Sequence, residues 1–168
     1  LSIAEGGLLN ISDILVTMKE KITQAASDTL SSAERNAIKT ELVQLTAEVN
    51  NIVDETTFNS IQLLDGNYIN KSYQTGEDTT NVLSMSIAKQ GTTSTGFNAT
   101  DLEIDTANVA TLVFSAANAS IALSRVDTAI EVVSDGLQNI AAKISRMGIK
   151  ESTLSIAITN TEATRSRI

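Results

Sequence analysis

Aliphatic side chains recur at alternating steps of three and four residues in the first part of the chain. The pattern runs through six positions: Leu8, Ile11, Leu15, Met18, Ile22 and Ala25. This alternation is the heptad pattern of helices that pack along a narrow apolar stripe, and it predicts a helix over residues 3–27. Residues 27–29 interrupt it, and Ser31 followed by Glu34 predicts a capping box at the start of the next helix.

The same pattern predicts two further helices. A helix over residues 32–56 carries it at Ile38, Leu42, Leu45, Val49 and Ile52. The connection to the first helix is short, so the two are expected to lie antiparallel. A third helix over residues 119–168 carries it at Leu123, Val126, Ile130, Val133, Leu137, Ile140, Ile144, Met147, Leu154 and Ile158. Gly136 and Gly148 each cost about 1 kcal/mol relative to Ala there, a cost that packing along so long a seam would offset.

The region between the second and third helices has the composition of strands and turns. Residues 72–75 and 82–87 predict two short strands, and in the second of them Leu83, Met85 and Ile87 share an apolar face. Asp65-Gly66 predicts a turn, and residues 90–100, rich in Gly, Ser, Thr and Asn, predict a surface loop.

These elements predict a mainly α fold. The expected architecture is an elongated antiparallel three-helix bundle, coiled-coil-like in its packing, with a small β-hairpin within residues 60–90. At 168 residues the chain is long enough for one domain with a real core, so residues 1–168 are expected to form a single domain.

The composition removes most catalytic chemistry. The chain has no His and no Cys, so no triad base, thiol nucleophile, zinc cage or haem ligand set is available, and we expect no enzyme activity and no cofactor. The net charge of −8 disfavours nucleic acid and anionic membrane surfaces as partners. No stretch approaches the roughly 18 consecutive apolar residues of a membrane-spanning helix.

Two short motifs have the spacing of ligand sites but lack the necessary residues. A calcium loop starting at Asp101 requires Gly at its sixth position and Glu at its twelfth, where the chain has Thr106 and Leu112. Gly91 and Gly96 have the spacing of a phosphate loop, but the Lys that would contact phosphate is missing. We therefore expect no metal site, and a solvated strand face or loop over residues 101–105.

Three stretches of the chain resemble bacterial flagellins. Residues 5–10 (Glu-Gly-Gly-Leu-Leu-Asn) with the helix that follows look like the first body helix of that family. Phe58-Asn59-Ser60, with Asp65-Gly66 after it, is similar to the family's Phe-Asn-Gly step into its hairpin. Residues 160–168 resemble the stretch that leads into the terminal helix. The three stretches occur in the family's order and span nearly the whole chain.

The resemblance implies a rod-like flagellin body domain that self-assembles into the flagellar filament outside the cell and serves motility. Its implied partners are other flagellin subunits, a flagellar export chaperone and cap proteins. The family's terminal helices, which form the inner tube of the filament, are missing from residues 1–168, so this segment alone is expected to stay monomeric. A hook–filament junction protein and a helical adaptor or secretion chaperone remain alternatives, although the hairpin argues against the last two.

The resemblance also implies a binding patch, because flagellins are ligands of an animal Toll-like receptor. Carried over without gaps, the family's Gln and Glu fall on Gln24 and Glu41, but its key Arg falls on Thr17 and its Leu on Lys21. Losing the guanidinium and the apolar anchor would remove roughly 2 kcal/mol each. We therefore expect weak receptor activation or none.

Overall fold

Three helices form the shaft of the molecule in the structure, which is a computed structural model and describes residues 1–27, 29–76, 81–89, 95–111, 113 and 115–166. They are α1 (Ser2–Ala25), α2 (Ser32–Glu55) and α3 (Ala116–Arg165). All six heptad positions predicted in α1 are buried, so this seam is confirmed. The predicted capping box is also confirmed, since the Ser31 hydroxyl accepts from the Glu34 amide and the Glu34 carboxylate accepts from the Ser31 amide at 2.8 Å.

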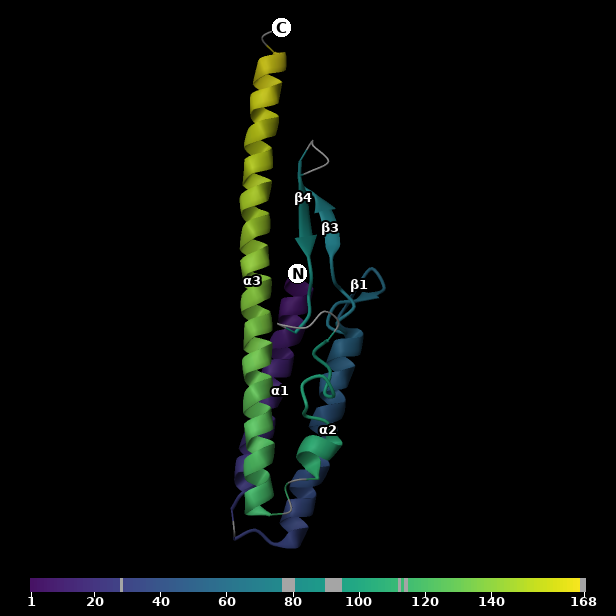
Figure 1. Cartoon of the computed structure of the whole chain (residues 1–168), viewed down its shortest axis with the longest axis vertical. Coiled ribbons are helices and arrows are strands. Elements are labelled where there is room, and N and C mark those ends of the chain that lie inside the picture. The colour runs from purple at the N-terminus through teal and green to yellow at the C-terminus, as the bar shows by residue number, and fades with distance from the viewer. Residues whose placement is uncertain (28, 77–80, 90–94, 112, 114, 167–168) are drawn as a thin grey trace.

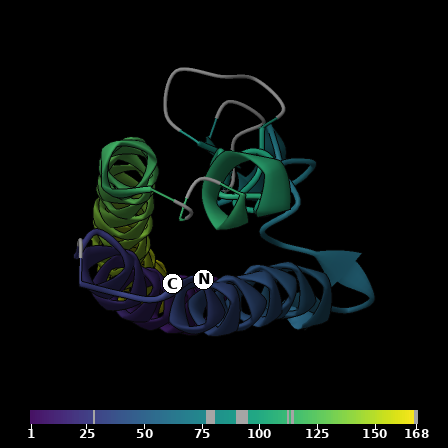
Figure 2. The same ribbon diagram turned by 90° about the horizontal axis from the view of Figure 1, so that it is seen from below.

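The helices are arranged with α1 in the middle. It runs antiparallel to both α2 and α3, as Figure 1 shows, and packs extensively against each of them. Direct contact between α2 and α3 is slight. Residues 95–111 and Val113, called the fourth segment below, lie between these two helices instead, and their short π-helix, η1 (Thr106–Ala110), packs on both. The end-on view in Figure 2 shows this irregular segment in the fourth position of the bundle.

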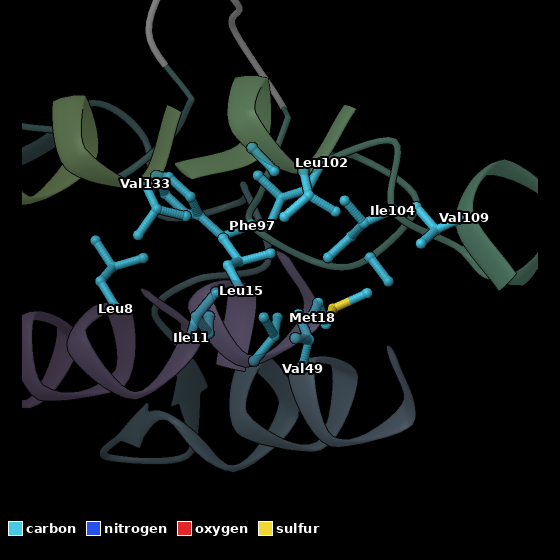
Figure 3. Packing of buried hydrophobic residues seen from close by; sticks show 14 of the residues in the cluster. Leu8, Ile11, Leu15, Met18, Val49, Phe97, Leu102, Ile104, Val109 and Val133 are labelled. Atoms are coloured by element: carbon cyan, nitrogen blue, oxygen red, sulfur yellow. The ribbon is translucent and has the colours of Figure 1, made fainter. Parts of the chain in front are cut away.

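Gly96, Phe97 and Ala99 of the predicted surface loop are buried, so the prediction of a surface segment was wrong there; Thr100 is exposed, and residues 90–94 lie outside the described residues. Phe97 is 1% exposed and is the largest of the fully buried side chains, and Ala99, Leu102 and Ile104 are buried near it (Figure 3). The Phe97 amide donates to the Leu64 carbonyl at 2.9 Å, which holds the segment against the body. These apolar side chains follow no helical or strand period, which is why the sequence pattern missed them.

Two small antiparallel pairs of strands lie at the end of α2 and beyond it. Strands β3 (Lys71–Gln74) and β4 (Val82–Met85) form the predicted hairpin, and Leu83, Met85 and Ile87 are buried as expected. Strands β1 (Thr57–Phe58) and β2 (Ile61–Gln62) form a second hairpin that was not predicted. Its two turn residues, Asn59 and Ser60, have φ values of 51° and 61°. Two successive residues with positive φ form the turn of a two-residue β-hairpin. The sequence Asn-Ser predicts such a turn less strongly than Asn-Gly, so the hairpin was missed.

The outer half of α3 corrects another prediction. Met147, Leu154 and Ile158 were predicted to belong to the buried seam, but they are 38%, 39% and 54% exposed. The reason is that α3 continues past the start of α1 at Ser2, where only the β3–β4 hairpin lies beside it (Figure 1). Every residue from Ser145 to Ser166 is exposed. Within the described part of the chain, no helix is both long and apolar enough to cross a membrane.

Candidate interaction surfaces

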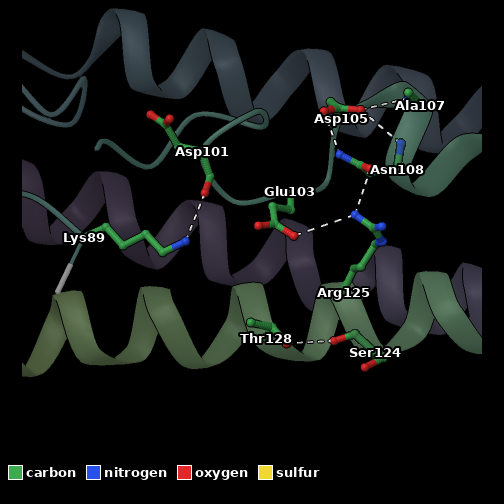
Figure 4. Close-up of polar contacts among 9 residues, drawn as sticks. All are labelled: Lys89, Asp101, Glu103, Asp105, Ala107, Asn108, Ser124, Arg125 and Thr128. Carbon is green, nitrogen blue, oxygen red and sulfur yellow. Dashed lines mark hydrogen bonds and ion pairs between the residues drawn. The ribbon is translucent and has the colours of Figure 1, made fainter. Parts of the chain in front are cut away.

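The three acids of residues 101–105 each serve a different intramolecular contact (Figure 4). The Asp101 carboxylate accepts from the Gly96 amide at 2.9 Å, and the Asp105 carboxylate accepts from the first amides of η1. Glu103 lies 3.7 Å from the Arg125 guanidinium of α3. Asp101 and Asp105 thus stabilise turns inside the fourth segment, and Glu103 joins it to α3. Over the described residues, no group of three potential ligands comes together to hold a metal ion.

A buried arginine closes the lower end of the bundle. Arg35 of α2 is 8% exposed, and its guanidinium donates to the Ala25 carbonyl, to the Ser27 carbonyl at 2.7 Å and, at 3.5 Å, to the Val113 carbonyl. One side chain therefore ties together the end of α1, the start of α2 and the fourth segment. The sequence held a signal for it, because Arg35 stands three residues before the core residue Ile38 and so shares its helix face.

The residues predicted for receptor binding lie on the outside of the shaft. Thr17, Lys21 and Gln24 are spaced by four and three residues and share one face of α1. The ammonium of Lys21 pairs with the Glu41 carboxylate of α2 at 2.6 Å, and Gln24 and Glu41 are exposed. Gln24 and Glu41 thus lie exposed on two neighbouring helices, and the Glu41 carboxylate is already paired with Lys21.

An apolar cavity of about 260 Å³ lies at the upper end of α1, where it meets the two hairpins and α3. Its lining includes Ile3, Phe58, Tyr68, Tyr73 and Met147. The two tyrosine hydroxyls are hydrogen-bonded to each other, and burial together with this bond raises the pKa of Tyr68 to about 12. With its pKa raised in this way, the phenol of Tyr68 stays protonated at ordinary pH and contributes packing and a hydrogen bond.

Several of the largest apolar side chains are exposed on the outer surface of the helices. They include Leu9 and Val16 on α1, and Ile121, Ile149 and Ile156 on α3, all between 46% and 64% exposed. Scattered apolar side chains are normal on a monomer. In this molecule the exposed apolar side chains are distributed along an elongated shaft. Neighbouring molecules can therefore contact them over much of its length.

The amino-terminal part of the chain matches a described protein family. Residues 1–69 match the family described as bacterial flagellin N-terminal helical region. The chain is 36% identical over 85 residues to Flagellin B of Vibrio anguillarum, which covers 51% of this chain and 23% of that protein. It is 29% identical over 166 residues to the flagellin of Halalkalibacterium halodurans, covering 98% of this chain and 57% of that protein. The chain therefore spans from about a quarter to just over half of the length of these relatives.

Solved structures share the same architecture. The crystal structure of Bacillus cereus flagellin superposes with a TM-score of 0.72 at 20% identity, covering 90% of this chain and 82% of that one. FliC from Burkholderia pseudomallei superposes with a TM-score of 0.68 at 17% identity, covering 86% and 97%. These matches establish the fold, with its helical shaft and small strands.

Proposed function

We propose that this chain, a bacterial flagellin by its matched amino-terminal region and its fold, is a structural subunit that packs against copies of itself to build the flagellar filament. The observation that carries the proposal is the exposed outer half of α3, a projecting helix with several aliphatic side chains and few neighbours of its own. A helix that only one hairpin accompanies gains stability by packing against a further surface, since isolated helices are marginal in water.

The names of related proteins support this assignment. Besides the two flagellins above, the chain is 35% identical over 74 residues to the "flagellar filament 41 kDa core protein" of Borreliella burgdorferi, which covers 44% of this chain and 22% of that protein. A filament subunit is favoured over a junction protein, adaptor or chaperone by these names. We assign no catalytic activity, and we place the assembled protein in the extracellular flagellum.

The finer partners follow from the same assignment. A subunit that assembles outside the cell must be kept from assembling inside it, so we propose an export chaperone and a filament cap as further partners. Activation of an animal Toll-like receptor is expected to be weak or absent, because Lys21 occupies Glu41 and no arginine stands at Thr17.

Electron microscopy tests the central proposal. The full-length protein, purified as monomer and seeded under polymerising conditions, is expected to give long helical filaments whose outer shell fits the α1–α3 shaft. A matched sample of residues 1–168 alone is expected to stay monomeric in sedimentation. Filaments that lack this shaft in their density, or full-length protein that never polymerises, would refute the assignment.

A further inference from the structure

We propose that the outer half of α3 binds the acidic side of α2 on a second copy of the chain. This inference rests on the proposed function and says which surfaces of the subunits meet. One surface, called the basic face below, consists of Arg146, Ile149, Lys150 and Ile156. The other, called the acidic stripe, consists of Glu41, Glu48 and Glu55.

The basic face is the most exposed apolar part of α3 and carries unpaired positive charge. Ile149 and Ile156 are 64% and 60% exposed, and they stand seven residues apart on one side of the helix. Arg146 and Lys150 stand one turn apart beside them, and neither forms an ion pair with any described residue. Two cations with exposed isoleucines beside them favour an acidic, partly apolar partner.

This face points away from the core of its own molecule. Ile149 follows the buried Ile140 by nine residues, which is two and a half turns of helix, so the two side chains lie on opposite sides of α3. The hairpin β3–β4 lies along the other side, where Leu154 and Ile158 help to line crevices with Thr75. Lys150 stands at the border of the two sides and also lines these crevices. Within the described residues, neither α1 nor the hairpin covers Ile149 and Ile156, so this face is open to a partner.

The acidic stripe has the opposite charge and a helical spacing of seven residues. Glu41, Glu48 and Glu55 are exposed on one side of α2, and no Lys or Arg occurs between Lys39 and Lys71. Glu41 is engaged by Lys21, which leaves Glu48 and Glu55 available to an incoming cation. Just beyond the stripe, the β1–β2 turn presents Phe58 and Ile61, which are 61% and 45% exposed.

Charge and shape together favour a second copy of this chain as the partner. Residues 143–166 carry four Lys or Arg and two Glu, so the outer half of α3 is net positive. Residues 40–70 carry five Asp or Glu and no Lys or Arg, so the region around the acidic stripe is net negative. Opposite charges on two separate surfaces of one molecule allow a head-to-tail contact between copies. Such a contact builds an open helical array wherever the rotation between neighbouring copies does not close into a ring.

Charge reversal in the full-length protein tests the pairing. Arg146→Glu with Lys150→Glu, or Glu48→Lys with Glu55→Lys, is expected to raise the critical concentration for polymerisation at least tenfold. Combining all four changes restores opposite charges across the contact and is expected to return it to within about threefold of the unchanged protein. The matched control is Glu131→Lys with Asp135→Lys, two exposed acids one turn apart on the lower part of α3, which is expected to leave assembly unchanged. Circular dichroism of each monomer checks that the helices remain folded.

Cysteine chemistry tests the contact directly, because residues 1–168 contain no cysteine. Filaments assembled from a mixture of Ile149→Cys subunits and Glu48→Cys subunits, treated with copper–phenanthroline in air, are expected to give a disulfide-linked dimer that requires both variants. The Ile149→Cys variant is expected to react with maleimide as a monomer and to be protected in filaments. Protection already in the monomer would mean that another part of the same chain covers this face, and it would overturn the inference.

The outcomes separate this inference from the proposed function. Unchanged protein that forms no filament refutes the proposed function itself. Filaments that form normally from the Arg146→Glu/Lys150→Glu variant, or reversals that fail to rescue each other, overturn only the pairing of the basic face with the acidic stripe.

Discussion

The ring of Phe97 lies directly against Gly136 in the middle of α3. A β-carbon added to Gly136 would stand 2.8 Å from Cζ of the ring and 3.3 Å from Cδ1 of Leu8. Distances this short are not tolerated between carbon atoms, so the absence of a side chain at Gly136 is what admits the ring. Glycine has a low helix propensity, but at this position it makes room for Phe97, the aromatic side chain of the fourth segment, to be buried.

Gly136→Ala is therefore expected to destabilise the protein, although alanine is the better helix former. Overpacking of a full core costs about 1–3 kcal/mol, which outweighs a propensity gain of about 1 kcal/mol. Gly148→Ala is the matched control, since nothing lies within 4 Å of a β-carbon there, and it is expected to stabilise by about 0.5–1 kcal/mol. Urea unfolding followed by circular dichroism measures both. Equal effects at the two glycines would contradict the packing account.

Replacement of Arg35 is expected to loosen the lower end of the bundle. Arg35→Met keeps the aliphatic stem but strips three backbone carbonyls of their donor, at about 1 kcal/mol for each hydrogen bond. Arg35→Lys is expected to recover only part of the lost free energy of unfolding, because a single ammonium group cannot reach the separated carbonyl oxygens that the guanidinium contacts. Arg146→Met, at an exposed arginine without an ion pair among the described residues, serves as the control and is expected to change the free energy of unfolding by less than about 0.5 kcal/mol.

The two tyrosines give a spectroscopic test of the cavity at the upper end of α1. The folded state raises the pKa of Tyr68 to about 12, above the ordinary value near 10, so it favours the protonated phenol. The stability from this group is present in full below pH 10 and is lost as the pH rises through 12. In Tyr73→Phe, where Tyr68 is the only tyrosine of residues 1–168, absorbance at 295 nm is expected to titrate above pH 10 but below its midpoint in the unchanged protein. A midpoint at 10 in the folded state would show that Tyr68 is not buried.

Receptor activation is expected to rise when the two departures from the family's patch are reversed together. Lys21→Leu removes the ammonium that holds Glu41, and Thr17→Arg supplies a guanidinium on the same face of α1. A cell reporter assay is expected to show at least a tenfold gain in potency for the double variant over the unchanged protein. Gln24→Ala in that background tests whether the patch itself is responsible, and an unchanged protein of full potency would refute the prediction of weak activation.

The helices could be predicted from the sequence because their packing follows a repeating pattern. The heptad steps from Leu8 to Ala25 correspond one to one with buried positions, and the capping box at Ser31 marks a helix start through local hydrogen bonds alone. Small residues were less visible. Ala119, Ala122 and Ala129 are buried in α3. Alanine occurs both in cores and on surfaces, so its position in the sequence does not predict burial.

The fourth segment could not be predicted because its contacts are distant in sequence and follow no period. Phe97 packs against Gly136, and the Ala99 amide donates to the side chain of Asn50, partners 39 and 49 residues away. The interaction surfaces were only partly foreseen for a related reason. The sequence placed Gln24 and Glu41 on helices, but only the fold shows that Lys21 pairs with Glu41 and that Ile149 is exposed on the side of α3 away from the core.

The insertion of one ring into one notch has a mechanical consequence for the shaft. A seam that repeats every seven residues offers α1 and α3 nearly equivalent alignments displaced lengthwise by one repeat. The ring of Phe97 fits only where Gly136 of α3 lies beside Leu8 of α1. A shift of α3 along α1 by seven residues would place a side chain in the space that the ring occupies. The shaft is thereby held at a single lengthwise alignment of α1 and α3, and a pulling or twisting force along it would meet resistance from one buried ring.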